Sequence, residues 1–223
     1  MANTHSGMVW KRDDKTIELR ILPLGASITW GTNSKSGNGY RKYLRDQLWV
    51  DGWSVDMVGT KNHGNMQDNA VEAHPGDVIT QIQTAAQKSL PYRPNVVLIN
   101  AGANDCKLRL DIPKAGARMR AMIEDIVHYD GMEKTTIILS TLIPSSDPQT
   151  AVSIPTVNAQ YRELVTTMRK EGMSIVLAEM NPPSSVVAHN LLSWPRDYTT
   201  NGKADITHPN DCGYRKMARV WLA

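Results

Sequence analysis

Cysteine occurs only twice in the 223-residue sequence, at Cys106 and Cys212. Two cysteines are too few for a disulfide scaffold or a structural zinc site, although they suffice for one disulfide bond. Charges or turn residues interrupt every apolar run well short of the length that crosses a bilayer, so we expect no association with a membrane. Residues 1–15 lack an apolar signal core and are expected to form an N-terminal extension. The sequence leaves two alternatives for the location of the protein: it is intracellular, or a leader peptide has been removed from it.

Long basic runs and nucleotide-binding motifs are also absent. Lys and Arg are scattered and the net charge is only +3, so nucleic acid is not an expected partner. No GxGxxG or P-loop follows any strand-like segment, which excludes a nucleotide-binding Rossmann domain. His63, His74, His128 and His189 have neither HxH nor HxxxH spacing, so we expect no metal and no other cofactor. We expect His74 to line a cleft and the other three to lie on the surface.

The regular alternation of two patterns indicates the fold. Hydrophobic residues make up 41% and charged residues 21% of the chain, as in an ordinary globular protein, and its length suggests one domain over residues 1–223. Strand-like segments at 16–23, 54–58, 95–100, 135–142 and 174–178 alternate with helix-like segments at 39–50, 76–90, 113–128, 157–170 and 213–222. The segments 60–75, 145–155 and 182–210 are expected to be loops. This order predicts an α/β fold, a three-layer α/β/α sandwich with a five-stranded parallel sheet.

The first strand leads to a candidate nucleophile. Gly25 interrupts the apolar pattern and Ser27 follows it, so Ser27 lies at a strand-to-helix turn. Open α/β sheets bind their ligands at this edge, and a hydroxyl there is flanked by free backbone N–H groups. A serine after a glycine is more often a turn or cap residue. The chemical interpretation therefore depends on other groups at the same edge.

Two later loops supply such groups. Asn104 follows the apolar strand at 95–100 and offers a side-chain amide donor; Asp205 and His208 lie three residues apart before the last helix. A carboxylate at this spacing can orient the imidazole and leave its second nitrogen free. Each residue alone also fits an ordinary turn or solvated loop. Together they supply a nucleophile, a base, an orienting carboxylate and an amide donor, which are the parts that acyl transfer requires.

Four blocks of the sequence resemble those of the SGNH (GDSL-type) hydrolases. The blocks are residues 25–29 (GASIT), Gly76, residues 102–105 (GAND) and residues 205–209 (DITHP). The resemblance extends from about residue 18 to the end and implies a flavodoxin-like hydrolase fold. It also implies that Ser27 is the nucleophile, His208 the base and Asp205 its orienting carboxylate.

The resemblance further implies an oxyanion hole made by the N–H of Ser27, a glycine N–H and the side chain of Asn104. Gly76 and Gly59 both compete for the glycine position. We favour Gly76, because it directly precedes an expected helix and so presents a free N–H. The aspartate that usually precedes the family's nucleophile is Ala26 here. That change concerns the bracing of the nucleophile loop, since acyl transfer does not need this carboxylate.

Within the superfamily, the sequence is similar to the fungal-type branch of carbohydrate esterase family three. That branch implies a secreted enzyme that removes acetyl groups from xylan or related sugars, so the expected partner is a small acyl ester or an acetylated carbohydrate. Trp30, Tyr40 and Trp194 are candidates to stack on sugar faces, and core or rim positions are equally compatible with them. The alternatives are a lipase-like or small-metabolite esterase and a catalytically silent sugar-binding module.

The cysteines follow two of the proposed site residues. Cys106 comes two residues after Asn104 and Cys212 four after His208. If Asn104 and His208 face one acyl centre, their loops run side by side, and the two cysteines come within reach of a disulfide bond. Two unpaired cysteines are the alternative. A monomer is assumed.

Overall fold

The computed structural model describes residues 17–183 and 192–223. The expected extension 1–15 and His189 lie outside these ranges. The central strand is β1 (Glu18–Gly25), which pairs with three other strands. Its apolar side chains alternate between the two faces of the sheet: Leu22 and Leu24 enter one core, and Ile21 enters the other. Both faces of β1 are therefore covered, as its nearly continuous apolar sequence indicates.

The main sheet is predominantly parallel. On one side of β1 lie β5 (Val96–Asn100), β6 (Thr136–Ser140) and β7 (Ile175–Ala178), all parallel to it. On the other side, β2 (Ser54–Met57) pairs with the first half of β1, and β4 (Ala70–Ala73) pairs with its last two residues. The five strands expected from the sequence have the order β2-β1-β5-β6-β7, which is the flavodoxin-like order.

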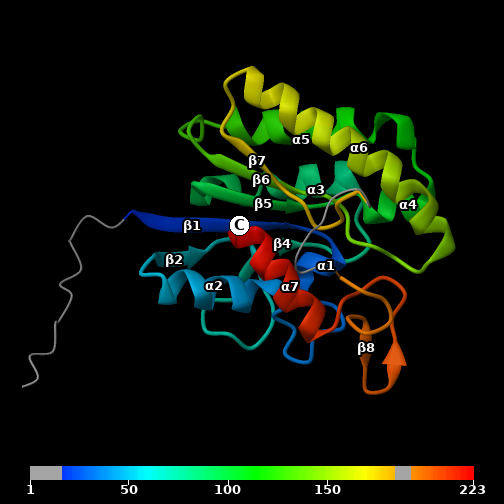
Figure 1. Cartoon of the computed structure of the whole chain (residues 1–223). Coiled ribbons are helices and arrows are strands. Elements are labelled where there is room, and N and C mark those ends of the chain that lie inside the picture. Colours follow the sequence, from blue (N-terminus) through cyan, green and yellow to red (C-terminus); the bar gives the residue numbers. More distant parts are fainter. Residues whose placement is uncertain (1–16, 184–191) are drawn as a thin grey trace, which may run out of the picture.

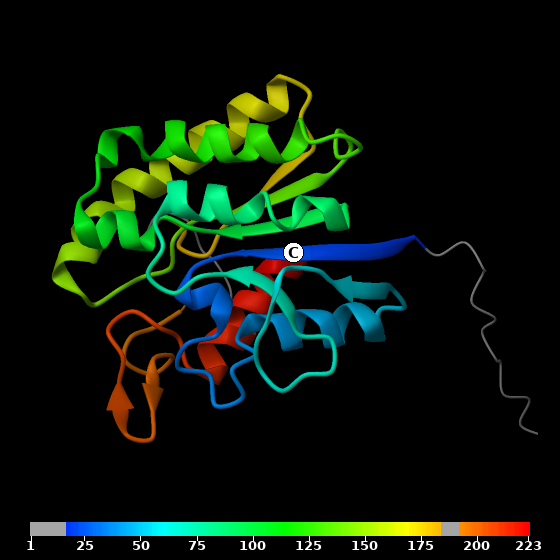
Figure 2. The ribbon, with the colours of Figure 1, turned by 180° about the vertical axis from the view of Figure 1, so that it is seen from behind.

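Helices cover both faces, so the predicted α/β sandwich is confirmed. Figure 1 shows α3 (Ile79–Ala86), α4 (Ala103–Leu108), α5 (Ala115–Val127) and α6 (Pro148–Lys170) above the sheet. The helices α1 (Ser27–Trp30), α2 (Tyr40–Val50) and α7 (Asp211–Leu222) lie below it, and the reverse view in Figure 2 shows the same two layers. Each layer packs on its own core of buried residues.

The sheet has seven strands rather than the expected five. The segment 60–75, expected to be a loop, contains β4 and also β3 (Lys61–Asn62), which runs antiparallel to β4. The sequence of β4 is AVEA, and its glutamate conceals a strand buried at three of its four positions. The irregular stretch 182–210 likewise contains a small hairpin of β8 (Thr199–Thr200) and β9 (Lys203–Ala204).

Two helices begin three or more residues away from their predicted start. The segment 145–155 was expected to be a loop because of its prolines, but α6 begins at Pro148. Proline fits the first turn of a helix, and the Asp147 side chain caps it by accepting the N–H of Thr150 at 2.9 Å. The helix expected from Gly76 begins later, at Ile79, after a turn at 75–76.

The carboxyl ends of β1 and β5 lead into α1 and α4, and Figure 1 shows both near the β8–β9 hairpin at one end of the sheet. Within the ranges described, no helix is both long and apolar enough to span a membrane. The loops that carry the predicted site residues therefore meet at one edge, which is the usual ligand-binding edge of this architecture.

Candidate active site

Ser27 is the first residue of α1, directly after β1. The preceding bend requires a glycine, because a Cβ at Gly25 would lie 2.4 Å from the Asn100 carbonyl oxygen and 2.4 Å from the Thr29 hydroxyl. As the first residue of a helix, Ser27 has a backbone N–H without an intrahelical acceptor. Ala26, which stands where the family usually has aspartate, is buried in the core. Apolar packing of Ala26 in the core therefore holds the residue before the nucleophile, in place of a carboxylate.

Ser27, His208 and Asp205 form one hydrogen-bonded line. The Ser27 hydroxyl lies 2.9 Å from Nε2 of His208, and Nδ1 of His208 lies 3.1 and 3.2 Å from the carboxylate oxygens of Asp205. An ionised carboxylate only accepts hydrogen bonds, so Nδ1 carries the proton and Nε2 presents its lone pair to the hydroxyl. The structure thus brings together three residues that come from the two ends of the chain.

The Asp205 carboxylate is held by its own loop. Its Oδ1 accepts the backbone N–H groups of Thr207 at 2.7 Å and His208 at 2.8 Å. Burial alone would raise the pKa of Asp205, but these hydrogen bonds and the nearby His208 outweigh it and hold the pKa below its usual value. The aspartate is therefore ionised near neutral pH and oriented before any substrate binds.

Two side chains from elsewhere fix this loop, and sequence analysis missed one of them. The Asn33 amide donates to the carbonyls of His208 at 2.9 Å and Tyr198 at 3.1 Å. The indole N–H of Trp194 donates to the Asp205 carbonyl at 3.1 Å. A lone asparagine in a turn gives no sequence signal for such a long-range contact. Both contacts limit the movement of the imidazole.

Asn104 lies in the first turn of α4, and its side-chain amide donates to the Asp77 carbonyl at 2.8 Å. The buried carboxylate of the next residue, Asp105, accepts the N–H of Ile79 at 3.0 Å and pairs with Arg118 at 2.9 Å. Asn104 is thus tied to the turn that contains Gly76. Through its contact with the N–H of Ile79, Asp105 also holds the start of α3 against α4.

The structure separates the two candidate glycines. The N–H of Val58, next to Gly59, donates to the carbonyl of Ile21, six residues before Ser27 along an extended strand. At about 3.3 Å per residue, Gly59 therefore lies far from the nucleophile. A Cβ at Gly59 would lie 2.3 Å from the backbone of Val71, so this glycine serves the approach of β2 to β4. Gly76 instead lies two residues after His74. The N–H of His74 donates to the carbonyl of Gly25 at 3.1 Å, so this part of the chain runs beside the end of β1 that leads to Ser27.

The four candidate lining residues have different environments. Tyr40 is fully buried in the core beneath α2, and its burial raises its pKa to about 12, so its prediction as a substrate-lining residue is wrong. Trp30 is half-buried and stacks on His63 with ring centroids 3.9 Å apart. His63 was expected to lie on the surface and is half-buried, whereas His128 is exposed as expected. Trp194 is 48% exposed.

His74 is the fourth candidate. Its side chain is 28% exposed, and its Nε2 lies 2.6 Å from the buried carboxylate of Glu72. The cysteines are unpaired: Cys106 is buried in the core and Cys212 is exposed on α7. Cys106 faces the core from α4, so of the two alternatives the structure shows the unpaired cysteines and not the disulfide bond.

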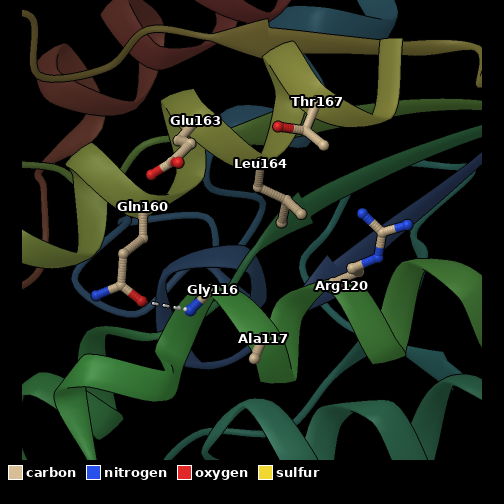
Figure 3. A pocket seen from close by; sticks show the side chains of 7 residues that line it. All are labelled: Gly116, Ala117, Arg120, Gln160, Glu163, Leu164 and Thr167. Carbon is tan, nitrogen blue, oxygen red and sulfur yellow. Dashed lines mark hydrogen bonds between the residues drawn. The ribbon is translucent and has the colours of Figure 1, made fainter. Parts of the chain in front are cut away.

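Among the hollows on the described surface, one adjoins the candidate site and another lies away from it. One of about 480 Å³ is lined by Asp205, Asn33 and the β8–β9 hairpin, so it adjoins the hydrogen-bonded line. The other, about 270 Å³, lies between α5 and α6, where the Gly116 N–H donates to Gln160 (Figure 3). None of the residues around the second hollow belongs to the candidate site. No cluster of three or more potential metal ligands occurs in residues 17–183 or 192–223.

A parallel sheet with a serine, a histidine and an aspartate in line at its carboxyl edge is the arrangement found in serine hydrolases. The sequence matches the GDSL-like Lipase/Acylhydrolase family over residues 24–216, and the chain belongs to that family. The resemblance drawn from the four sequence blocks is thereby confirmed.

Solved structures support the same fold. A family 3 carbohydrate esterase from Clostridium thermocellum superposes with a TM-score of 0.76 at 23% identity, over 92% of this chain and 94% of that one. A family 3 carbohydrate esterase from Talaromyces cellulolyticus gives 0.70 at 19% identity, over 92% and 94%. A multidomain esterase from Ruminococcus flavefaciens is 24% identical over 247 residues; the match covers 92% of this chain and 28% of that protein. The chain therefore spans under a third of the length of this relative.

Proposed function

We propose that the protein is a serine esterase that hydrolyses small acyl esters, with O-acetyl groups on carbohydrate as its substrates. The observation that carries the proposal is the 2.9 Å contact between the Ser27 hydroxyl and Nε2 of His208, with Asp205 on the other ring nitrogen. This geometry supports transfer of the hydroxyl proton to the imidazole during attack on a carbonyl carbon.

The reaction has two halves. Ser27 Oγ attacks the acyl carbon while His208 takes its proton, and the tetrahedral intermediate collapses as His208 gives that proton to the departing alcohol. Water then attacks the acyl-Ser27 ester with His208 again as base, and a second collapse releases the acid and restores the serine. Asp205 keeps the imidazole in one tautomer and stabilises its charged form. These steps use only side chains of this chain and one water.

Negative charge develops on the carbonyl oxygen in both tetrahedral intermediates. We assign its stabilisation to the N–H of Ser27, the N–H of Gly76 and the amide of Asn104. The contact of Asn104 with the Asp77 carbonyl occupies one amide hydrogen and leaves the second for the oxyanion. Donors fixed before the reaction stabilise such charge without the cost of reorganisation.

Two features support a carbohydrate ester. The hollow beside Asp205 is lined by apolar groups of Ala204 and Ile206 together with hydrogen-bonding groups of Asn33, Thr200 and Lys203, and such a mixed lining can accept the hydroxyl groups of a sugar. Trp194 exposes an indole ring whose N–H is fixed on the Asp205 carbonyl, so an aromatic face is available beside the site. The family 3 carbohydrate esterases and the multidomain esterase are similar to this chain in fold or sequence.

A substrate panel tests the proposal. Acetate release is measured from acetylated xylan and acetylated pectin, and alcohol release from aryl esters of increasing acyl length. We expect kcat/KM to be highest for acetyl esters, and release from acetylated xylan to disappear in Ser27→Ala. A preference that increases with acyl length would instead support a lipase-like enzyme. Binding of xylan without hydrolysis of any ester would support a sugar-binding module.

A further inference from the structure

We propose that Glu72 and His74 are positioning residues for the oxyanion hole, acting through the turn formed by residues 75–77. The inference rests on the proposed esterase function. Neither residue belongs to the hydrogen-bonded line of Ser27, His208 and Asp205, yet both lie in β4 or directly after it, beside the end of β1.

Glu72 is a fully buried carboxylate with a complete set of donors. Its Oε2 accepts the N–H of Thr60 at 3.1 Å, the hydroxyl of Thr60 at 2.6 Å and the hydroxyl of Ser89 at 2.5 Å. Its Oε1 accepts from Nε2 of His74 at 2.6 Å. Burial alone would raise the pKa of Glu72, but the hydrogen bonds from Ser89, Thr60 and His74 outweigh it and hold the pKa below its usual value. The carboxylate is therefore charged near neutral pH.

This charge fixes the imidazole of His74. An ionised carboxylate only accepts, so Nε2 of His74 must carry a proton. Thr60 and Ser89 hold Oε2 and thereby orient Oε1 toward the ring. The backbone of His74 is held as well, because its N–H donates to the Gly25 carbonyl at 3.1 Å. His74 is thus anchored through its side chain to Glu72 and through its backbone to Gly25, and Gly25 lies two residues before the nucleophile.

The next residues connect His74 to the oxyanion donors. The N–H of Asp77 donates to the His74 carbonyl at 3.1 Å and closes the turn around Gly76. The carbonyl of Asp77 then accepts the amide of Asn104 at 2.8 Å. One continuous series of contacts therefore runs from Glu72 through His74 and the turn to Asn104. Without the imidazole, the turn would lose its side-chain connection to Glu72 and β4, and the Gly76 and Asn104 donors would be held less firmly relative to the nucleophile.

Three variants separate positioning from folding. His74→Ala removes the anchor, and His74→Gln restores a donor near the position of Nε2. Thr135→Val is the control for folding, because it removes a buried hydrogen bond to the Pro94 carbonyl at the opposite, amino edge of the sheet. We expect His74→Ala to lower kcat about 10-fold with KM within about twofold, since a displaced oxyanion donor retains part of its effect. His74→Gln should recover much of the loss. Thr135→Val should lower Tm while kcat stays close to wild type.

A double-mutant cycle with Asn104→Ala gives the decisive kinetic result. If His74 acts through Asn104 and its turn, His74→Ala should cost much less in the Asn104→Ala background than in wild type. An equal loss in both backgrounds would overturn the proposal. A loss confined to KM, or a kcat loss that Thr135→Val reproduces in proportion to its Tm, would overturn it as well.

One measurement does not depend on activity. In wild-type protein, ¹⁵N NMR of the His74 imidazole at pH 8 should show a protonated Nε2, and a bare Nε2 would overturn the proposal. If wild-type protein hydrolyses none of the esters in the panel, the esterase function fails. The imidazole spectrum then still decides whether Glu72 holds His74 in the proposed way, so the two failures are distinguishable.

Discussion

The side-chain amide of Asn33 lies 2.9 Å from the backbone carbonyl of His208, across a sequence separation of 175 residues. Asn33 follows the helix that begins with Ser27, and His208 carries the proposed base. The loop after the nucleophile therefore holds the loop of the base directly. The distance between Ser27 Oγ and His208 Nε2 depends on this contact as well as on the sheet.

Asn33→Ala should weaken catalysis without unfolding the protein. The change removes donors to the carbonyls of His208 and Tyr198, at a cost of about 1–3 kcal/mol in the free energy of unfolding. We expect kcat to fall because the imidazole gains freedom, while KM changes little. Steady-state kinetics and urea unfolding of the same samples test this. Unchanged kcat would show that the remaining contacts of this loop fix the base without Asn33.

Asp205→Asn should nearly abolish turnover with the fold retained. An amide can donate to Nδ1 and favour the tautomer with a proton on Nε2, which cannot accept the serine proton. The same change in another serine hydrolase costs about 10⁴ in kcat, and we expect a loss of that order. Asp211→Asn is the matched control, because Asp211 lies in the same segment but bonds Ser34. Similar losses in both variants would contradict the role of Asp205.

Arg41 should be far more important for stability than an exposed arginine. It is fully buried, and its guanidinium donates to five backbone carbonyls, those of Thr29, Trp30, Gly37, His63 and Asn69. Arg41→Met leaves several carbonyls without a donor, at about 1–3 kcal/mol each. Arg120→Ala is the control, because its ion pairs with Glu124 and Glu171 lie at the surface, where solvent screens them and they add little to stability. Equal shifts in the urea midpoint would contradict this expectation.

Acid should destabilise the protein through Glu72 and Glu179. Burial raises the pKa of each, but hydrogen bonds outweigh it, those of Arg162 and Thr141 in the case of Glu179, so both folded-state pKa values lie below the usual 4.5. Each carboxylate therefore contributes stability that is fully present above about pH 4.5 and is lost as pH falls through its folded-state pKa. Urea midpoints between pH 7 and pH 3 should show this loss, and Glu72→Gln should reduce it. A midpoint that stays constant down to pH 3 would argue against it.

The sequence predicted the apolar strands better than it predicted the surroundings of the candidate site. The strands β5, β6 and β7 and the second half of β1 are nearly continuous apolar runs, and such runs predict a buried parallel sheet. β4 was missed because Glu72 interrupts its pattern, and the burial of that carboxylate depends on donors from distant loops. Tyr40 was misassigned although it lies four residues before Leu44, and residues at this spacing share one face of a helix, here the buried face of α2. Asn33 carried no signal, because its contact joins two ends of the chain.

The most direct test of the central claim is to observe the acyl-enzyme on Ser27. Wild-type protein is mixed with p-nitrophenyl acetate, quenched in acid within the first turnovers and analysed by peptide mass spectrometry. We predict an added acetyl group on the peptide that contains Ser27, a stoichiometric burst of p-nitrophenol, and neither signal in Ser27→Ala. Acetylation of another residue, or a burst that survives in Ser27→Ala, would contradict the account.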